Sequence, residues 1–178
     1  MPWFEDIKIG ARTDLGRHTF TADDIIAFAT KYDPQYFHVD AEAAKRGPFG
    51  TLTASGWHTT ATWMKLMIAS RQGREEPLDA DGNRPPAGGP SPGFLEMKWP
   101  TPVRAGDTIS YSTEVIEKID MRSRPGWGIV RSRNTGVNQN GETVLSFIGQ
   151  GLIQRRVQKD TEGKRGRRRW HARERKSR

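Results

Sequence analysis

The chain has 178 residues, enough for one domain with a substantial core, and its mean hydropathy of −0.78 predicts that part of it lies outside that core. It contains no cysteine, which excludes disulfides and cysteine-ligated metal sites and suits a reducing cytoplasm. The first residues do not form a signal peptide, and no apolar stretch approaches the ~20 residues of a membrane span. We therefore expect a soluble, cytoplasmic protein.

The net charge of +8 is concentrated at the C-terminal end. Residues 155–178 contain 12 Lys or Arg and 3 Asp or Glu, whereas residues 1–154 contain 17 basic and 18 acidic side chains. This division predicts a near-neutral domain over 1–154 and a basic C-terminal tail over 155–178. Such a tail is usually disordered and solvated; alternatively, it contacts nucleic acid, an anionic membrane surface or a cofactor phosphate.

The N-terminal part predicts a strand followed by a helix. Residues 10–20 alternate weakly, as a strand does. Thr21 can cap the following helix, and Asp23 and Asp24 in its first turn interact favourably with the positive end of the helix dipole. The helix is expected to end near Tyr32, because Pro34 pushes the residue before it out of the helical region.

Two more helices and a long loop are predicted next. A short helix is expected over 41–45 and a longer one from about Gly56 to Arg71, which is apolar around most of its circumference and therefore expected to be buried. His58, near the start of the longer helix, is expected to have a hydrogen-bonded packing role. Residues 71–93 are rich in Pro and Gly, which predicts a loop insertion that is a lid, a binding loop or a disordered segment.

The C-terminal half has the pattern of a β-meander. Alternating or apolar segments predict four strands, at 94–99, 107–119, 127–139 and 142–154. Asn140-Gly141 between the last two is a strong hairpin signal. One buried helix against an antiparallel sheet is an α+β arrangement.

The most promising residues for chemistry are Asp33 and His38. On a continuous helix they would be separated by about 140° of rotation and would face different ways. Pro34 interrupts the helix directly after Asp33, so the chain can curl back and bring the imidazole near the carboxylate. Such a pair can hold one water and exchange its protons. The alternative is an ordinary helix end with a surface histidine nearby.

Gly56, at the start of the longer helix, supplies a second candidate group. Its backbone N–H can lie at the positive end of the helix dipole and stabilise a carbonyl oxygen that becomes negative. The alternative is that glycine is needed for close packing of the helix, and the two interpretations are compatible. An acid/base pair together with an oxyanion donor is what hydration of an α,β-unsaturated thioester requires.

The order of these motifs resembles a known family. The segments that carry the resemblance are Phe28-Ala29, Asp33 to His38-Val-Asp40, Ala43-Ala44, Phe49-Gly50, Ala54-Ser55-Gly56 and Lys98 to Ile109. Together they resemble the hydratase motif of MaoC-like dehydratases and (R)-specific enoyl-CoA hydratases, over roughly residues 5–154.

The resemblance implies a hotdog fold, in which an antiparallel sheet wraps around a long central helix. It also implies a homodimer or larger assembly with active sites at the subunit interface. The substrate would be acyl-CoA or another acyl thioester, with no further cofactor and no metal. Asp33 and His38 would activate the water and exchange the proton at the α-carbon, and the Gly56 amide would stabilise the thioester oxygen.

The chain departs from the family pattern around these residues. The family usually has Gly-Asp-x-Asn-Pro-x-His and Ala-His-Gly, whereas here Tyr32 precedes the aspartate, Pro34 follows it directly and Ser55 precedes the last glycine. Gln35 also takes the place of the family's asparagine, and these differences leave the acyl group open between a fatty chain and a short or unusual one. We expect substrate contacts from Tyr32, Gln35, Tyr36, Phe49, Ser55, Trp57 and Arg104; the alternative for Arg104 is a turn residue before Gly106-Asp107.

Three functions remain open on the sequence. The first is an acyl-CoA hydratase or dehydratase that uses Asp33 and His38. The second is a non-catalytic hotdog protein that senses acyl-CoA and binds nucleic acid through its basic tail. The third is a thioesterase on the same fold, because fold alone does not determine function.

Overall fold

The computed structural model describes residues 2–72, 78, 82 and 88–156. In chain order, its elements are η1 (Phe4–Asp6), β1 (Arg12–Thr19), α1 (Ala22–Tyr32), α2 (Tyr36–Val39), α3 (Ala41–Ala44), α4 (Gly56–Ala69), β2 (Gly93–Lys98), β3 (Thr108–Asp120), β4 (Trp127–Val137) and β5 (Thr143–Gln154).

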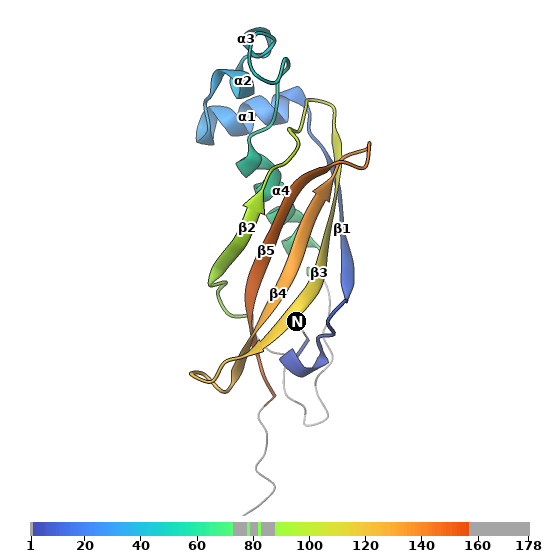
Figure 1. Ribbon diagram of the computed structural model, residues 1–178, viewed down its shortest axis with the longest axis vertical. Coiled ribbons are helices and arrows are strands. Elements are labelled where there is room, and N and C mark those ends of the chain that lie inside the picture. The colour runs from blue at the N-terminus through green and yellow to red at the C-terminus, as the bar shows by residue number, and fades with distance from the viewer. Residues whose placement is uncertain (1, 73–77, 79–81, 83–87, 157–178) are drawn as a thin grey trace, which may run out of the picture.

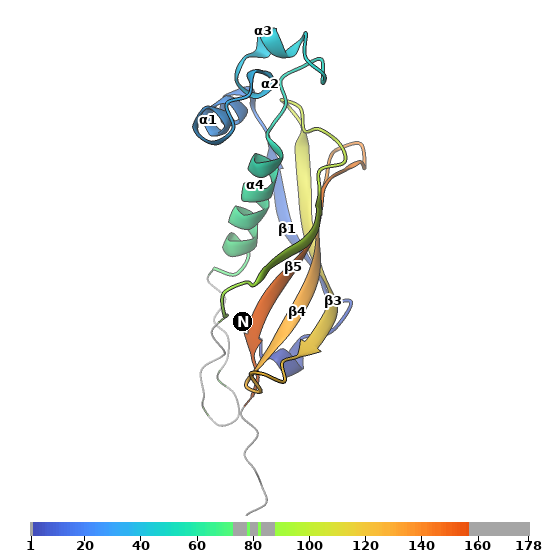
Figure 2. The same cartoon turned by 60° about the vertical axis from the view of Figure 1, so that its left-hand side comes forward.

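One antiparallel sheet with the strand order β1-β3-β4-β5-β2 forms the body of the protein. The sheet curves over α4, and the helices α1, α2 and α3 lie together at one end of the sheet (Figures 1 and 2). This is the predicted α+β hotdog arrangement. The predicted hairpin is also present: β4 and β5 are joined by a turn in which Gly141 has φ of 81°, a left-handed conformation that suits glycine.

Helix α4 packs on the sheet with only one of its faces. Trp63 packs against Phe147 of β5, and the Tyr111 hydroxyl of β3 donates a 3.1 Å hydrogen bond to the Thr59 carbonyl. The opposite face leaves Trp57, Met64 and Ile68 about half exposed. The expectation that α4 is buried on all sides is therefore wrong for a single chain, because the sheet covers one side of the helix and an apolar circumference does not say what covers the other.

The helices α1, α2 and α3 form the layer that carries the candidate residues. Thr21 caps α1 as predicted, since its hydroxyl accepts the Asp24 N–H at 3.1 Å. The sequence did not predict α2, which is a single turn between Pro34 and Asp40. Asp40 then caps α3 by accepting the Glu42 and Ala43 N–H groups. These successive short turns fold the segment after Asp33 back on itself.

Most of the predicted 71–93 loop lies outside the described residues. The prediction of a lid, a binding loop or a disordered segment therefore also concerns residues outside that part of the chain. Its described end, 88–92, runs along β5. The Gly89 N–H donates to the Leu152 carbonyl at 2.9 Å, and the Ser91 hydroxyl donates to the Gln150 carbonyl at 2.6 Å. This end of the loop is therefore held against the sheet.

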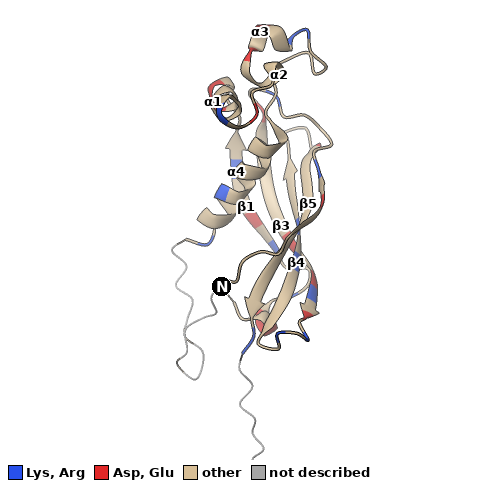
Figure 3. Cartoon of the chain, turned by 90° about the vertical axis from the view of Figure 1, so that its left-hand side faces the viewer, with Lys and Arg blue, Asp and Glu red and all other residues tan. Residues whose placement is uncertain are grey.

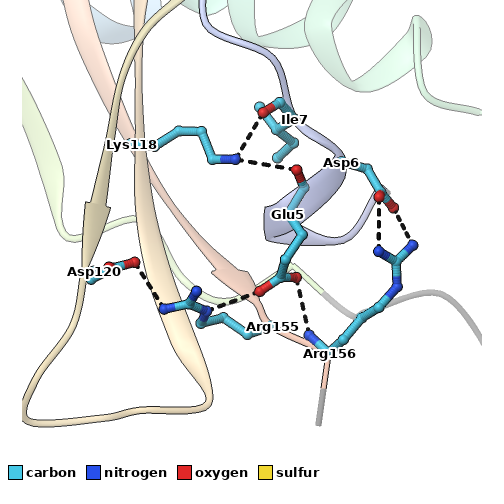
Figure 4. A network of polar contacts seen from close by, with 7 residues as sticks. All are labelled: Glu5, Asp6, Ile7, Lys118, Asp120, Arg155 and Arg156. Atoms are coloured by element: carbon cyan, nitrogen blue, oxygen red, sulfur yellow. Dashed lines mark hydrogen bonds and ion pairs between the residues drawn. The ribbon is translucent and has the colours of Figure 1, made fainter. Parts of the chain in front are cut away.

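The two ends of the folded part meet at η1 (Figure 4). Arg155 pairs with Glu5 at 2.9 Å and with Asp120 at 2.8 Å, and Arg156 donates to Asp6 at 2.9 Å. Ordered contacts thus extend two residues beyond the predicted boundary at Gln154. The remainder of the predicted tail, 157–178, lies outside the described residues. No helix in the described ranges has the length and hydropathy of a membrane span.

Candidate active site

Asp33 and His38 are brought together by the end of α1. Asp33 is the C-cap residue of α1, with φ of −155° and ψ of 68°, and His38 lies in the following turn, α2. The Asp33 Oδ2 atom is 3.6 Å from His38 Nε2, and the two side chains are 21% and 8% exposed. The break at Pro34 therefore produces the convergence that the sequence suggested.

The tautomer of His38 follows from its other ring nitrogen. Nδ1 lies 2.6 Å from the Thr53 carbonyl oxygen. A carbonyl oxygen can only accept, so Nδ1 carries the hydrogen and donates it. In the neutral ring, Nε2 then has a free lone pair on the side that faces Asp33, as a general base requires.

The carboxylate of Asp33 receives a hydrogen bond at each oxygen. Ser55 Oγ donates to Oδ2 at 2.6 Å, and Gln35 Nε2 donates to Oδ1 at 2.8 Å. Burial alone would raise the pKa of Asp33, but these two donors and the nearby His38 together hold that pKa below its ordinary value. Asp33 is therefore an anion at neutral pH.

The separation between Asp33 and His38 fits a shared water. A distance of 3.6 Å is too long for a direct hydrogen bond between the carboxylate and the imidazole. A water beside the line between them can lie about 2.8 Å from both atoms and donate one hydrogen to each. Both groups accept, so such a water would present its own oxygen lone pairs outward.

The N-terminus of α4 begins at Gly56, beside the same histidine. Among the described residues, no acceptor takes the Gly56 N–H. A Cβ atom at this position would lie 2.6 Å from the Trp99 ring, so glycine is also required for close packing. The two interpretations of Gly56 considered from the sequence are thus both compatible with the structure.

His38 and Gly56 both line one cavity of about 260 Å³. Its other lining residues are Phe37, Phe49, Thr53, Ala54, Thr59, Trp99, Pro100, Thr101, Pro102, Val103 and Val144. The wall is mostly apolar, as expected of a pocket for an acyl group. Asp33 does not belong to this lining, but its Oδ2 atom lies 3.6 Å from Nε2 of His38, which does.

The predicted substrate contacts fall into three groups. Phe49 lines the cavity, whereas Gln35 and Ser55 bond to the Asp33 carboxylate. The remaining four do not line the cavity: Tyr32 packs on Phe28, Tyr36 on Phe37, Trp57 on Trp99, and Arg104 is an exposed residue at the turn before Asp107.

Sequence reasoning missed the segment from Trp99 to Val103, which forms one wall of the cavity. It lies more than 60 positions from His38, and its sequence contributed only to the family resemblance of Lys98 to Ile109. Sequence reasoning also missed that Thr53 orients His38. The contact uses the backbone carbonyl of Thr53, which a residue of any type would supply, so the sequence carries no signal for it. His58 does pack, stacked on Phe28 at 4.4 Å, but its Nδ1 has no hydrogen-bond partner among the described residues, contrary to the expectation.

Comparisons with known proteins agree with this fold. Residues 7–137 match the family model described as "MaoC like domain". A MaoC-like dehydratase from Rhodospirillum rubrum superposes with a TM-score of 0.71 at 38% identity, covering 88% of this chain and 99% of that one. The 3-hydroxybutyryl-CoA dehydratase of Methylorubrum extorquens is 27% identical over 146 residues, 80% of this chain and 82% of the relative. A segment of 46 residues, 26% of this chain and 33% of the relative, is 52% identical to the uncharacterized protein YdeM of Bacillus subtilis.

The fold and these comparisons thus define a hotdog protein of the hydratase and dehydratase class. Because the family model covers more than half of the chain, the chain belongs to the MaoC-like domain family.

Proposed function

We propose that the protein is an acyl-CoA hydratase or 3-hydroxyacyl-CoA dehydratase, which adds water to, or removes it from, the α,β bond of an acyl thioester. The observation that carries this proposal is the 3.6 Å approach of Asp33 to His38 near the Gly56 N–H, for which the described part of the chain offers no acceptor. The relatives named as dehydratases support the same class of reaction.

In the direction of hydration, the water between the two side chains attacks the β-carbon. His38 Nε2 takes one of its protons, while the ionised Asp33 holds the other hydrogen and stabilises the imidazolium that forms. Negative charge moves to the thioester oxygen, where the Gly56 N–H and the positive end of α4 stabilise it. His38 then returns the proton to the α-carbon, so that the elements of one water are added. These groups supply every proton transfer, and we propose that no cofactor is needed beside the thioester.

A named relative favours a short acyl group. The named substrate of the Methylorubrum relative, a 3-hydroxybutyryl thioester, has such a chain. We therefore expect four-carbon substrates to be turned over faster than eight- or twelve-carbon ones.

The direct test is an acyl-CoA panel followed by the absorbance of the conjugated thioester, with product analysis. Crotonyl-CoA should lose this absorbance with the wild-type protein, and Asp33→Asn or His38→Ala should reduce the rate by roughly a hundredfold or more at unchanged fold. Release of free CoA would instead indicate a thioesterase. Salt-sensitive binding of DNA or RNA without turnover would favour the nucleic-acid-binding alternative.

We also propose that the protein forms a homodimer through the exposed face of α4 and β2. This face is apolar: its exposed side chains include Trp57, Met64, Ile68 and Phe94. Lys65 is the only charged residue of α4 (Figure 3). A contiguous exposed apolar patch is typical of an interface.

Sedimentation of Met64→Glu tests the dimer. The substitution places a charge in the centre of the patch and should yield monomers. Lys65→Glu, which adds a carboxylate one residue away at a position that is already charged, is the matched control and should remain dimeric. A wild-type protein that sediments as a monomer at assay concentration would contradict the proposal.

We also propose that the hydratase or dehydratase activity is cytoplasmic, as expected from the sequence.

A further inference from the structure

Ser55 lies at the junction of the two halves of the candidate site. It is the N-cap residue of α4 and directly precedes Gly56. Its side chain is buried, at 1% exposure, and one hydroxyl group contacts both the Asp33 carboxylate and the Trp57 N–H. It therefore bonds to an acid/base residue from one helix and to the backbone of another.

The direction of these hydrogen bonds is fixed by the chemistry of a hydroxyl group. Ser55 Oγ accepts the Trp57 N–H at 3.2 Å, which leaves its single hydrogen for Asp33 Oδ2 at 2.6 Å. The hydrogen bond from Ser55 to Asp33 is short because its acceptor, the carboxylate, is charged. A protonated Asp33 would compete for the same role as donor, so the arrangement favours the carboxylate form.

Ser55 acts on the oxygen that faces the histidine. Oδ2, which accepts from Ser55, is the atom that lies 3.6 Å from His38 Nε2. The other oxygen, Oδ1, accepts from Gln35, whose side chain is exposed. Water can replace an exposed donor such as Gln35 at small cost, whereas it cannot replace a buried one such as Ser55 without rearrangement.

From this geometry, and resting on the function proposed above, we propose that Ser55 is a positioning residue and not a substrate contact. Its hydroxyl orients the Asp33 carboxylate toward His38 and fixes it relative to the Gly56 N–H at the start of α4. The water-binding pair and the oxyanion donor are thereby held in one frame, although they come from separate helices. Precise placement of this kind contributes strongly to catalytic rates.

Ser55→Ala tests the proposal through the pH profile. Activity needs the ionised Asp33 and the neutral His38 together, so the acidic limb of kcat/KM reports the coupled titration of this pair in the free enzyme. Without the Ser55 donor, burial should dominate, so the limb should move to higher pH, and kcat should fall roughly 10- to 100-fold, as expected for loss of a hydrogen bond to a charged group. Ser55→Thr, which keeps the hydroxyl, should restore the wild-type profile.

Two matched controls separate positioning from stability. Thr21→Ala removes the N-cap of α1, a bond of 3.1 Å that does not involve Asp33, and should lower the melting temperature without moving the acidic limb. Gln35→Ala removes the exposed donor to Asp33 and should move the limb less than Ser55→Ala does. Should Ser55→Ala fail to fold, Ser55→Cys keeps the volume and replaces the hydroxyl by a weak donor, and it should move the limb in the same direction.

An NMR titration of the Asp33 carboxyl carbon gives a readout that does not depend on the reaction. The pKa of Asp33 should be higher in Ser55→Ala than in the wild type. Identical titrations in the two proteins, or a limb that Ser55→Ala moves no more than Thr21→Ala, would overturn the role of Ser55. A wild-type protein that hydrates no acyl-CoA would reject the proposed function instead, so the two failures are distinguishable.

Discussion

At the scale of single residues, the geometry of the site depends on a few positions at which a change of one side chain would alter it. Pro34 ends helix α1 and lets the chain turn back, which brings His38 near Asp33. This pairing could therefore be predicted from the sequence. The bond from Ser55 to Asp33 could not, because it joins residues 22 positions apart and depends on how α4 enters the site. Similarly, nothing in the sequence pairs Gly56 with Trp99.

Gly56→Ala is expected to impair both stability and turnover. The added Cβ would lie 2.6 Å from the Trp99 ring, which must move to accommodate it. Overpacking of this kind costs about 1–3 kcal/mol, and displacement of the cavity wall should lower kcat/KM for crotonyl-CoA. Denaturant unfolding and steady-state kinetics measure the two effects. Trp99→Leu in the Gly56→Ala background makes room and should recover part of the stability; no recovery would show that another contact is responsible.

At the scale of elements, α1 and α4 meet through an aromatic cluster around His58. The ring of His58 is stacked on Phe28 of α1 and packs edge-on against Phe20. Burial, with a smaller effect of His18, lowers the pKa of His58 to about 4 from its ordinary 6.5, against the opposing effect of Asp24. The helix that ends in Asp33 is thus packed on an uncharged imidazole.

This shift predicts that the fold loses stability in mild acid. Between pH 6.5 and about 4 the unfolded chain binds a proton at His58 and the folded chain does not, so the free energy of unfolding falls as the pH falls. At ~1.4 kcal/mol per pKa unit, the change from 6.5 to about 4 corresponds to about 3.5 kcal/mol, which partial solvent screening lowers to about 2–3 kcal/mol. His58→Phe fills the site without titrating and should lose less stability over this interval in chemical denaturation. Equal losses in wild type and variant would contradict the assignment.

The elements also show where sequence patterns stop being informative. Each predicted strand and long helix is present, because period-two alternation and capping residues report local structure directly. The single turn α2 was missed, since four residues after a proline carry no periodicity. The exposed patch on α4 was misjudged for a different reason: hydrophobicity says that a face needs a partner, but not whether the partner is the sheet or another chain.

At the scale of the whole molecule, the two ends of the described part of the chain are held together far from the site. Lys118 donates to the Ile7 carbonyl at 2.9 Å, while Arg155 and Arg156 reach the acidic residues of η1 (Figure 4). Composition placed the start of the basic tail at residue 155, because it counts charges without their partners. The structure shows that the first two of these arginines belong to the folded part.

Truncation distinguishes the two boundaries. A chain that ends after Arg156 should melt at the wild-type temperature and retain full hydratase activity. A chain that ends after Gln154 loses the contacts of Arg155 and Arg156 with Glu5, Asp6 and Asp120 and should melt at a lower temperature. Equal melting temperatures for the two truncations would show that this network does not stabilise the fold.

The central claim, that Asp33 and His38 act on one water, is tested most directly by a double-mutant cycle on crotonyl-CoA hydration. Residues that act as a unit have strongly non-additive effects. The double variant Asp33→Asn/His38→Ala should therefore be about as slow as the slower single variant. Losses that multiply in the double variant, or a single variant that keeps the wild-type rate, would contradict the account.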